Sequence, residues 1–187
     1  ILSVIVYLGD PGAVIYGQVR IGKNGKPFKM WKFRSMYRNA DQMIDQLSEE
    51  QKRQYHTEFK IDNDPRITPV GNFLRKTSLD ELPQLFNILK GEMSFIGPRP
   101  ERPQIIREYI EEMPEFAYRT RVKAGLAGYA QVYGKYNTTP YDKLKLDLFY
   151  IENYSVWLDL KLMLLTLKIL FTPDSTEGVD EKQVTAM

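Results

Sequence analysis

The sequence predicts an α+β fold that is mainly helical and has one short β-hairpin near its N-terminus. Two β-prone runs, 14–21 and 27–36, flank the turn sequence Gly22-Lys23-Asn24-Gly25-Lys26. Asn-Gly between such runs favours a hairpin because both residues tolerate a positive φ. Most of the chain after residue 38 instead carries helix formers with apolar residues at helical spacing. A chain of 187 residues that is 43% hydrophobic can bury one sizeable core, so we expect a single domain over residues 1–171.

The other elements follow from local signals along the chain. The apolar segment 1–8 ends at Asp10-Pro11-Gly12 and is too short to span a bilayer. It is either the end of a longer apolar segment or an ordinary buried strand. Residues 124–128 are expected to be a glycine-rich connection. Helices are expected over 39–58, 70–76, 79–90, 102–112, 141–153 and 155–171, and the acidic, polar segment 172–187 is expected to be disordered.

The helix expected over 155–171 is the most apolar element of the chain. Its only charged residues are Asp159, Lys161 and Lys168. A wide apolar stripe with Trp157 at one end and lysines on the rim is typical of a helix at a membrane interface. The same pattern fits a core helix equally well.

Composition limits the classes of function. The chain has no cysteine and one histidine, so we expect no disulfide, no thiolate nucleophile and no zinc site, and any metal should be a hard ion on oxygen ligands. Residues 20–38 hold seven Lys or Arg and no acid. Such a stretch suits a polyanion, although an ordinary solvated face explains it as well. Because acidic residues balance the charge elsewhere and the terminal helix is apolar, lipid is the better partner and nucleic acid is not expected.

Two adjacent carboxylates, Asp80 and Glu81, stand near the start of an expected helix. Ser78 offers an N-cap with Glu81 three residues later, which is the capping-box pattern. Adjacent side chains on a helix point about 100° apart, so the two carboxylates need not face one another. A helix start attracts anions, and the pair is explained either as capping groups or as ligands of a metal and a phosphoryl group.

Basic residues near this pair favour the second explanation. Strand alternation places Lys32 and Arg34 on one face, opposite Trp31 and Phe33. Arg75 lies shortly before the pair. Another arginine is held between prolines in the turn Gly97-Pro98-Arg99-Pro100, where the fixed φ angles limit its freedom. Together these cations could clamp a diphosphate. The chain has no P-loop or G-x-G-x-x-G fingerprint, so the residues alone indicate metal-assisted phosphoryl transfer near a membrane.

Four sequence blocks closely resemble the bacterial sugar transferase family, the monotopic phosphoglycosyl transferases that act as polyprenyl-phosphate hexose-1-phosphate transferases. They are Lys32-Phe33-Arg34-Ser35-Met36, Asp64-Pro65-Arg66-Ile67-Thr68, the block 78–87 and Gly97-Pro98-Arg99-Pro100. The resemblance covers about residues 1–171 in the same order. It implies transfer of a sugar-1-phosphate from a UDP-sugar to a polyprenol phosphate such as undecaprenyl phosphate, with release of UMP. This is the first membrane step of exopolysaccharide, capsule or O-antigen synthesis.

The resemblance also implies a role for the carboxylates. By analogy Asp80 attacks the phosphate next to the sugar and forms a covalent phosphosugar intermediate, and Asp80 with Glu81 holds Mg²⁺. The substrate- and phosphate-binding residues are implied to be Lys32, Arg34, Arg75, Arg99, Lys123 and Gln131.

The resemblance further implies a place at the membrane. Residues 1–8 would be the end of a re-entrant membrane helix, truncated at its N-terminus, and the other helices would pack at the membrane interface. The protein would work on the anionic cytoplasmic face of the bacterial cell membrane, and a homo-oligomer is allowed. A buried or supporting role is expected for Asp147, which matches a family aspartate.

The chain departs from the family pattern in two places. It has Ala124-Gly125-Leu126-Ala127-Gly128 where the family commonly has Pro-Gly-Ile-Thr-Gly, and Gly134-Lys135-Tyr136-Asn137 where Gly-Arg-Asn is usual. Both lie away from the carboxylates in the sequence, so they bear on the choice of sugar rather than on the reaction. An alternative of another class is a catalytically silent, membrane-binding scaffold of a glycan-assembly complex.

Overall fold

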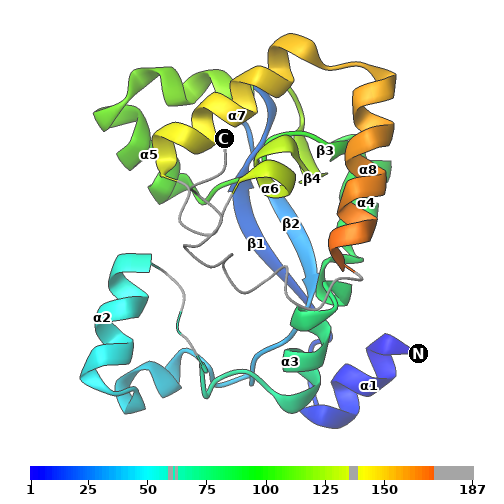
Figure 1. The fold of residues 1–187 in the computed structure, drawn as a ribbon. Helices are drawn as coiled ribbons and strands as arrows, with labels where there is room; N and C mark the ends of the chain where they lie inside the picture. The colour runs from blue at the N-terminus through cyan, green and yellow to red at the C-terminus, as the bar shows by residue number, and fades with distance from the viewer. Residues whose placement is uncertain (59–60, 62, 135–138, 171–187) are drawn as a thin grey trace, which may run out of the picture. The chain divides into compact units, whose positions relative to one another are not determined.

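The computed structural model describes residues 1–58, 61, 63–134 and 139–170, and it confirms a mainly helical chain with small sheets (Figure 1). Its described residues form two compact units. The first comprises residues 1–16 and 32–83, and the second comprises 17–31 and the chain from 84 onward. The segment 172–187, expected to be disordered, lies outside the described residues.

The predicted hairpin is present. Strands β1 (Ile15–Ile21) and β2 (Pro27–Phe33) form a two-stranded sheet. In the connection between them, Gly22 donates a backbone hydrogen bond to Lys26, with an N···O distance of 2.9 Å. Asn24 and Gly25 have φ angles of 57° and 72°, which is the conformation expected from an Asn-Gly turn.

The apolar N-terminal segment is helix α1 (Leu2–Gly9), so its interpretation as an ordinary strand is wrong. Helical backbone hydrogen bonds satisfy its polar groups, and it packs against α3 (Pro69–Lys76), where Gly9 lies next to Val70. Val6 is the buried side chain of the helix. No helix of the described residues is both long and apolar enough to cross a membrane.

The helix expected over 39–58 is divided into a 3₁₀ helix, η2 (Gln42–Gln46), and helix α2 (Glu49–Glu58). The division occurs because Ser48 starts a new helix. Its hydroxyl accepts a hydrogen bond from the Gln51 amide, and the Gln51 side chain accepts one from the Ser48 amide, both at 3.2 Å. This reciprocal capping favours an extended residue at Leu47 over a continuous helix.

The second unit contains a parallel pair of short strands that the sequence did not predict. β3 (Met93–Ile96) pairs with β4 (Ala124–Ala127), so part of the expected connection 124–128 is a strand. Glycine allows the close approach: a Cβ atom on Gly125 would lie 2.2 Å from the Gly97 nitrogen. The pattern was missed because glycine and alanine have low strand propensity and the pairing partner lies about thirty residues away in the chain.

Helices of the second unit close two small cores, and one of these cores includes residues of the two strands. The elements are α4 (Gln84–Leu89), α5 (Pro103–Glu112), the 3₁₀ helix η4 (Pro114–Arg121), α6 (Tyr129–Tyr133), α7 (Pro140–Asn153) and α8 (Val156–Leu170). One core contains Ile96, Ala127, Tyr150 and Leu162. The other core is built from residues of α5, η4 and α7, namely Ile106, Phe116 and Leu144. The helices predicted over 102–112, 141–153 and 155–171 are therefore confirmed, with small shifts at their ends.

Candidate active site

Asp80 and Glu81 lie in a short 3₁₀ turn, η3 (Leu79–Glu81), rather than in the first turn of a long helix. Ser78 has a left-handed backbone, with φ 54°, and its side chain makes no capping hydrogen bond, so the predicted capping box is wrong. Its amide bonds instead to the carbonyl of Arg75, and Ser78 thus terminates α3. Pro83 directly precedes α4, which begins at Gln84, and a residue without an N–H group is tolerated at a helix start.

The two carboxylates meet at one cation. The ammonium of Lys32 lies 2.6 Å from Glu81 Oε1 and 3.9 Å from Asp80 Oδ2. Asp80 is only 8% exposed, and the side chains of Glu81 and Lys32 are also largely covered. The tight turn therefore directs both carboxylates toward a shared position that a positive charge can occupy.

Arg75 of α3 lies beside this turn. Its Nε donates a 2.8 Å hydrogen bond to the hydroxyl of Ser35, a residue directly after β2. Desolvation lowers the pKa of the Arg75 guanidinium, while the carboxylates of Asp80 and Asp64 act in the opposite direction. Arg75 and Asp80 therefore lie close enough to interact electrostatically.

The block 64–68 supports the start of α3. Arg66 and Asp64 form a buried ion pair with an Nη2–Oδ2 distance of 2.7 Å. Burial alone would raise the pKa of Asp64, but the hydrogen bonds and charge of Arg66 hold that pKa below its ordinary value. Thr68 then caps the helix, because its hydroxyl accepts a 2.8 Å hydrogen bond from the Gly71 amide.

Arg34, expected to share a basic face with Lys32, has a different environment. Its terminal nitrogens contact the carboxylate and the carbonyl of Asp10, and its Nε donates to the Ala13 carbonyl at 2.6 Å. Arg34 thus ties the segment after α1 to the end of β2. Its guanidinium is committed to the protein, whereas Lys32 faces the carboxylates.

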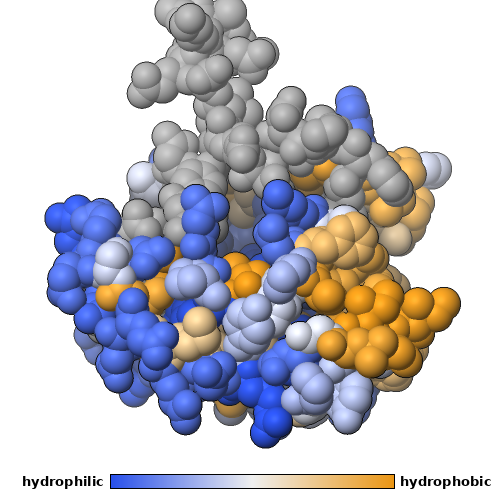
Figure 2. Space-filling model, turned by 90° about the horizontal axis from the view of Figure 1, so that it is seen from below, coloured by the Kyte–Doolittle hydropathy of each residue, from blue (hydrophilic) through white to orange (hydrophobic). Residues whose placement is uncertain are grey.

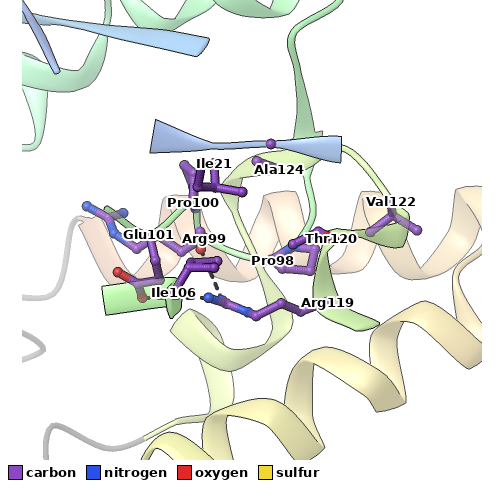
Figure 3. Close-up of a pocket in the computed structure, with 11 residues that line it drawn as sticks. Ile21, Pro98, Arg99, Pro100, Glu101, Ile106, Arg119, Thr120, Val122 and Ala124 are labelled. Atoms are coloured by element: carbon purple, nitrogen blue, oxygen red, sulfur yellow. Dashed lines mark hydrogen bonds and ion pairs between the residues drawn. The ribbon is translucent and has the colours of Figure 1, made fainter. Parts of the chain in front are cut away.

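The turn Gly97-Pro98-Arg99-Pro100 belongs to the second unit, where two guanidinium groups hold its backbone. Arg119 donates a 3.0 Å hydrogen bond to the Arg99 carbonyl, and Arg20 donates one of 3.1 Å to the Pro100 carbonyl. Figure 3 shows Arg119 reaching toward the turn from below. The cavity at this turn has a volume of about 10 Å³, which is barely enough for one water molecule, so it is no substrate pocket.

Asp147, expected to have a supporting role, is paired with Arg119. Both residues are almost fully buried, and Arg119 donates to one Asp147 oxygen from Nη2 at 2.6 Å and from Nε at 2.9 Å. Burial raises the pKa of Asp147, although the charge and hydrogen bonds of Arg119 act against that shift. Asp147 therefore acts on the turn through Arg119.

The remaining expected site residues, Lys123 and Gln131, also belong to the second unit. Lys123 is exposed, and its ammonium lies near Gly91. Gln131 donates a long hydrogen bond of 3.4 Å to the Leu126 carbonyl. Its Oε1 is buried and accepts no hydrogen bond from the residues that the structure describes.

Two residues of these networks were not identified from the sequence. Ser35 was quoted only as part of a motif, and Arg119 was not singled out. The contact of Ser35 with Arg75 spans 40 positions, and that of Arg119 with Asp147 spans 28. Periodicity and local spacing do not predict contacts between residues so far apart in the chain. The sequence block that contains Ser35 could, however, have marked this residue as a candidate.

The donor set of the site fits a hard cation. Within the described part of the chain, no cluster of three or more Asp, Glu, His or Cys side chains is arranged to hold a metal. Mg²⁺, however, commonly takes one or two carboxylates and completes its shell with water and substrate phosphate. Asp80 and Glu81, which converge on the Lys32 ammonium, satisfy that pattern.

Comparison with known proteins identifies the family. The family model described as "Bacterial sugar transferase" matches residues 1–173. The chain belongs to the bacterial sugar transferase family. It is 41% identical to the undecaprenyl-phosphate galactose phosphotransferase of Salmonella typhimurium and 42% identical to the UDP-glucose:undecaprenyl-phosphate glucose-1-phosphate transferase of Escherichia coli. Each match covers 88% of this chain and about a third of the relative, 35% and 34% respectively.

A third relative is shorter. The exopolysaccharide production protein ExoY of Sinorhizobium fredii is 39% identical, and the match covers 87% of this chain and 72% of that protein. Most of the relatives that lead the comparison are longer, so the chain spans about a third of their length.

Proposed function

We propose that the protein is a phosphoglycosyl transferase that moves a sugar-1-phosphate from a UDP-sugar to undecaprenyl phosphate or a similar polyprenol phosphate and releases UMP. The observation that carries the proposal is the convergence of Asp80 and Glu81 beside Lys32 and Arg75 in a chain of this family. The names of its relatives describe reactions of this kind. The step would initiate the synthesis of an exopolysaccharide, capsule or O-antigen repeat.

The proposed reaction has two displacements. An Asp80 oxygen forms a bond to the phosphorus next to the sugar while the bond to the bridging diphosphate oxygen breaks, and UMP leaves with that electron pair. An oxygen of the polyprenol phosphate then attacks the same phosphorus, and the Asp80 carboxylate is released unchanged. Two successive displacements return the enzyme to its starting state without a further reactant.

In this proposal, basic residues bind and orient the diphosphate. Lys32 and Arg75 bring positive charge to Asp80, which offsets the repulsion between a carboxylate and a phosphoryl group. The family resemblance also assigns phosphate binding to Arg99 and Lys123 and substrate binding to Gln131, whose buried Oε1 accepts no hydrogen bond from the described residues. Arg34 retains a supporting role in this scheme, because Asp10 and Ala13 engage its guanidinium.

Mg²⁺ is the proposed cofactor, held by Asp80 and Glu81. When bound, the ion would neutralise charge on the diphosphate and on the departing UMP. The Lys32 ammonium interacts with both carboxylates, which supports a cation site at this position.

Exposed apolar surface supports an association with a membrane, which the proposal places at the cytoplasmic face of the bacterial cell membrane. Figure 2 shows apolar residues gathered at the edge of the viewed face where α1 lies. Several large apolar side chains of α1 are exposed, among them Val4, Tyr7 and Leu8. In the second unit, α8 exposes Trp157 and Leu164. Helices of this kind bind at the boundary between headgroups and acyl chains.

The test measures UMP release by the full-length protein with Mg²⁺, a polyprenol phosphate and a panel of UDP-sugars. We expect release with at least one sugar and labelling of the protein by a UDP-sugar carrying radioactive phosphate next to the sugar. Asp80→Asn should fold normally, lose at least about a thousandfold in turnover, and lose the label. Asp45→Asn, a matched change at an exposed residue, should keep both.

Two results would contradict the proposal in different ways. Normal turnover by Asp80→Asn would exclude the covalent route through this residue. Silence of the folded wild-type protein across the whole panel would exclude the activity and favour the scaffold instead.

A further inference from the structure

We propose that the hydroxyl of Ser35 is a positioning group for Arg75, which leaves the outer edge of the Arg75 guanidinium to bind the donor diphosphate. The inference rests on the proposed function and adds a residue and a binding geometry to it. Ser35 touches no reacting atom in this scheme and acts only through Arg75.

The hydrogen bond between Ser35 and Arg75 is short. Ser35 is 8% exposed, and its Oγ accepts the Arg75 Nε–H at 2.8 Å. Among the described residues, no other protein group forms a hydrogen bond or ion pair with the Arg75 side chain. Arg75 is an exposed residue of α3, although part of its guanidinium is desolvated.

The Ser35 backbone is fixed from the side of α3. The Thr68 amide donates to the Ser35 carbonyl at 3.1 Å, and an adjacent bridge pairs Met36 with Ile67. Helix α3 packs so closely here that a Cβ atom on Gly71 would lie 1.9 Å from the Ser35 carbonyl oxygen. The contacts between the Ser35 backbone and the start of α3 therefore fix Ser35 relative to the helix that carries Arg75.

Three other cations of the first unit form ion pairs with carboxylates. Lys32 pairs with Glu81, Arg34 with Asp10, and Arg66 with Asp64. A phosphate that approached any of these three would have to compete with an ion pair. Within the described part of the chain, Arg75 forms no ion pair, and it lies within electrostatic reach of Asp80.

The position of the serine selects one edge of the guanidinium. Arginine binds phosphate through two parallel N–H groups, either from Nε and one terminal nitrogen or from the two terminal nitrogens. Ser35 occupies the Nε–H, so the phosphate is bound by the two terminal nitrogens. A lysine at position 75 would have neither the fork nor an N–H at the position where Ser35 accepts.

A double-mutant cycle in the full-length protein tests this geometry. The variants are Ser35→Ala, Arg75→Ala, Arg75→Lys and the two combinations with Ser35→Ala, and kcat/KM for the UDP-sugar is measured for each. We expect Ser35→Ala to lower kcat/KM about tenfold in the wild-type background. In either Arg75 variant the same change should alter kcat/KM by no more than about twofold, because the hydroxyl acts only on Nε–H.

Ser48→Ala is the matched control. It likewise removes a hydroxyl that accepts one hydrogen bond, in this case from the Gln51 backbone amide at the start of α2. It should lower the free energy of unfolding and leave kcat/KM unchanged. A tenfold loss from Ser35→Ala that persists in the Arg75→Ala background would overturn the proposal, as would an unchanged kcat/KM in Ser35→Ala alone.

Folding and activity are separated by two further measurements. If Ser35→Ala does not fold, Ser35→Cys keeps the side-chain volume with a weaker acceptor, and failure of both to fold overturns the proposal. If the wild-type protein releases no UMP, the proposed function fails by itself. In that case the role of Ser35 is tested by calorimetric measurement of UDP binding to the same variants. The proposal requires Ser35→Ala to weaken UDP binding only when Arg75 is present.

Discussion

At the scale of single residues, several cations of the described chain form ion pairs with carboxylates. Lys32 forms ion pairs with both carboxylates of η3. Arg66 is paired with Asp64, and Arg119 is paired with Asp147. Several of these pairs are buried, where losing one partner leaves a charge without compensation and costs about 3–5 kcal/mol. Such pairs hold the turns on which the proposed site depends.

Glu101 is the most shared carboxylate of the second unit. It contacts Lys143, and its oxygens lie 3.8 Å from Arg20 and from Arg119. Burial alone would raise the pKa of Glu101, but the charge of Lys143, followed by that of Arg119, lowers the pKa below its ordinary value. A carboxyl whose pKa is lower in the folded state stabilises the fold at neutral pH.

This residue predicts an acid-dependent loss of stability. The contribution of Glu101 is fully present above the pKa of an unfolded glutamate, about 4.3, and is lost as the pH falls from there through the folded-state pKa. Glu101→Gln should therefore lower the free energy of unfolding at pH 7 and flatten its decline between about pH 5 and 3. Urea unfolding at a series of pH values measures both effects.

Asp147 has a raised pKa, so its effect on the pH dependence of stability is opposite to that of Glu101. Asp147 is present in both the wild-type protein and Glu101→Gln, so the difference between these two proteins isolates Glu101. Glu111→Gln changes an exposed glutamate of α5 and serves as the control. If Glu101→Gln and Glu111→Gln gave the same pH dependence, the assignment of this effect to the buried network would be wrong.

At the scale of elements, α3 is the part that brings the proposed site together in the first unit. Thr68 caps its first turn, Gly71 allows it to touch Ser35, and Arg75 and Ser78 mark its end. The turn that carries Asp80 follows directly. Small changes in the position of α3 should therefore move both the Arg75 guanidinium and the Asp80 and Glu81 carboxylates.

Gly71→Ala is predicted to destabilise the protein even though it lies in a helix. Alanine normally stabilises a helix relative to glycine by up to about 1 kcal/mol. Here the added Cβ would lie 1.9 Å from the Ser35 carbonyl oxygen, and overpacking of this kind costs about 1–3 kcal/mol. Chemical denaturation measures the loss, and kcat/KM should fall with it because α3 carries Arg75.

The neighbouring residue provides the control for that experiment. Asn72 is exposed on the same helix, so Asn72→Ala should leave activity unchanged. Equal stability of the Gly71 and Asn72 variants would show that α3 can move away from Ser35 without cost.

At the scale of the whole molecule, binding to membranes is the property that the exposed apolar side chains predict. We expect the protein to cosediment with vesicles containing anionic lipid. Leu164 of α8 is 69% exposed, and Leu164→Glu should weaken vesicle binding at least about tenfold, since a buried leucine contributes about 1.5–3 kcal/mol. Quantitative cosedimentation over a range of lipid concentrations measures the change.

A charge added elsewhere distinguishes this effect from simple repulsion. Gln104 is exposed on α5, and Gln104→Glu adds the same charge outside α8. An equal loss of binding in both variants would mean that charge, and not insertion of α8, governs the association.

Local patterns were sufficient for much of the fold. The Asn-Gly turn and the helices over 102–112 and 141–153 follow from φ preferences and apolar spacing, which are properties of neighbouring residues. The same kind of reasoning failed at Ser78, where the capping pattern is present but the residue ends the preceding helix. It also failed at 124–127, where the strand exists because of its pairing with β3.

The sequence by itself determined the family, the hairpin and the candidate carboxylates with their basic neighbours, because these depend on residue identity and short spacing. Only the tertiary structure decided that Asp80 and Glu81 converge on Lys32, that Arg34 is committed to Asp10, and that Ser35 holds Arg75. Those contacts join residues 24 to 49 positions apart. Side-chain direction at such separations is set by how strands, turns and helices pack, which no local pattern in the chain records.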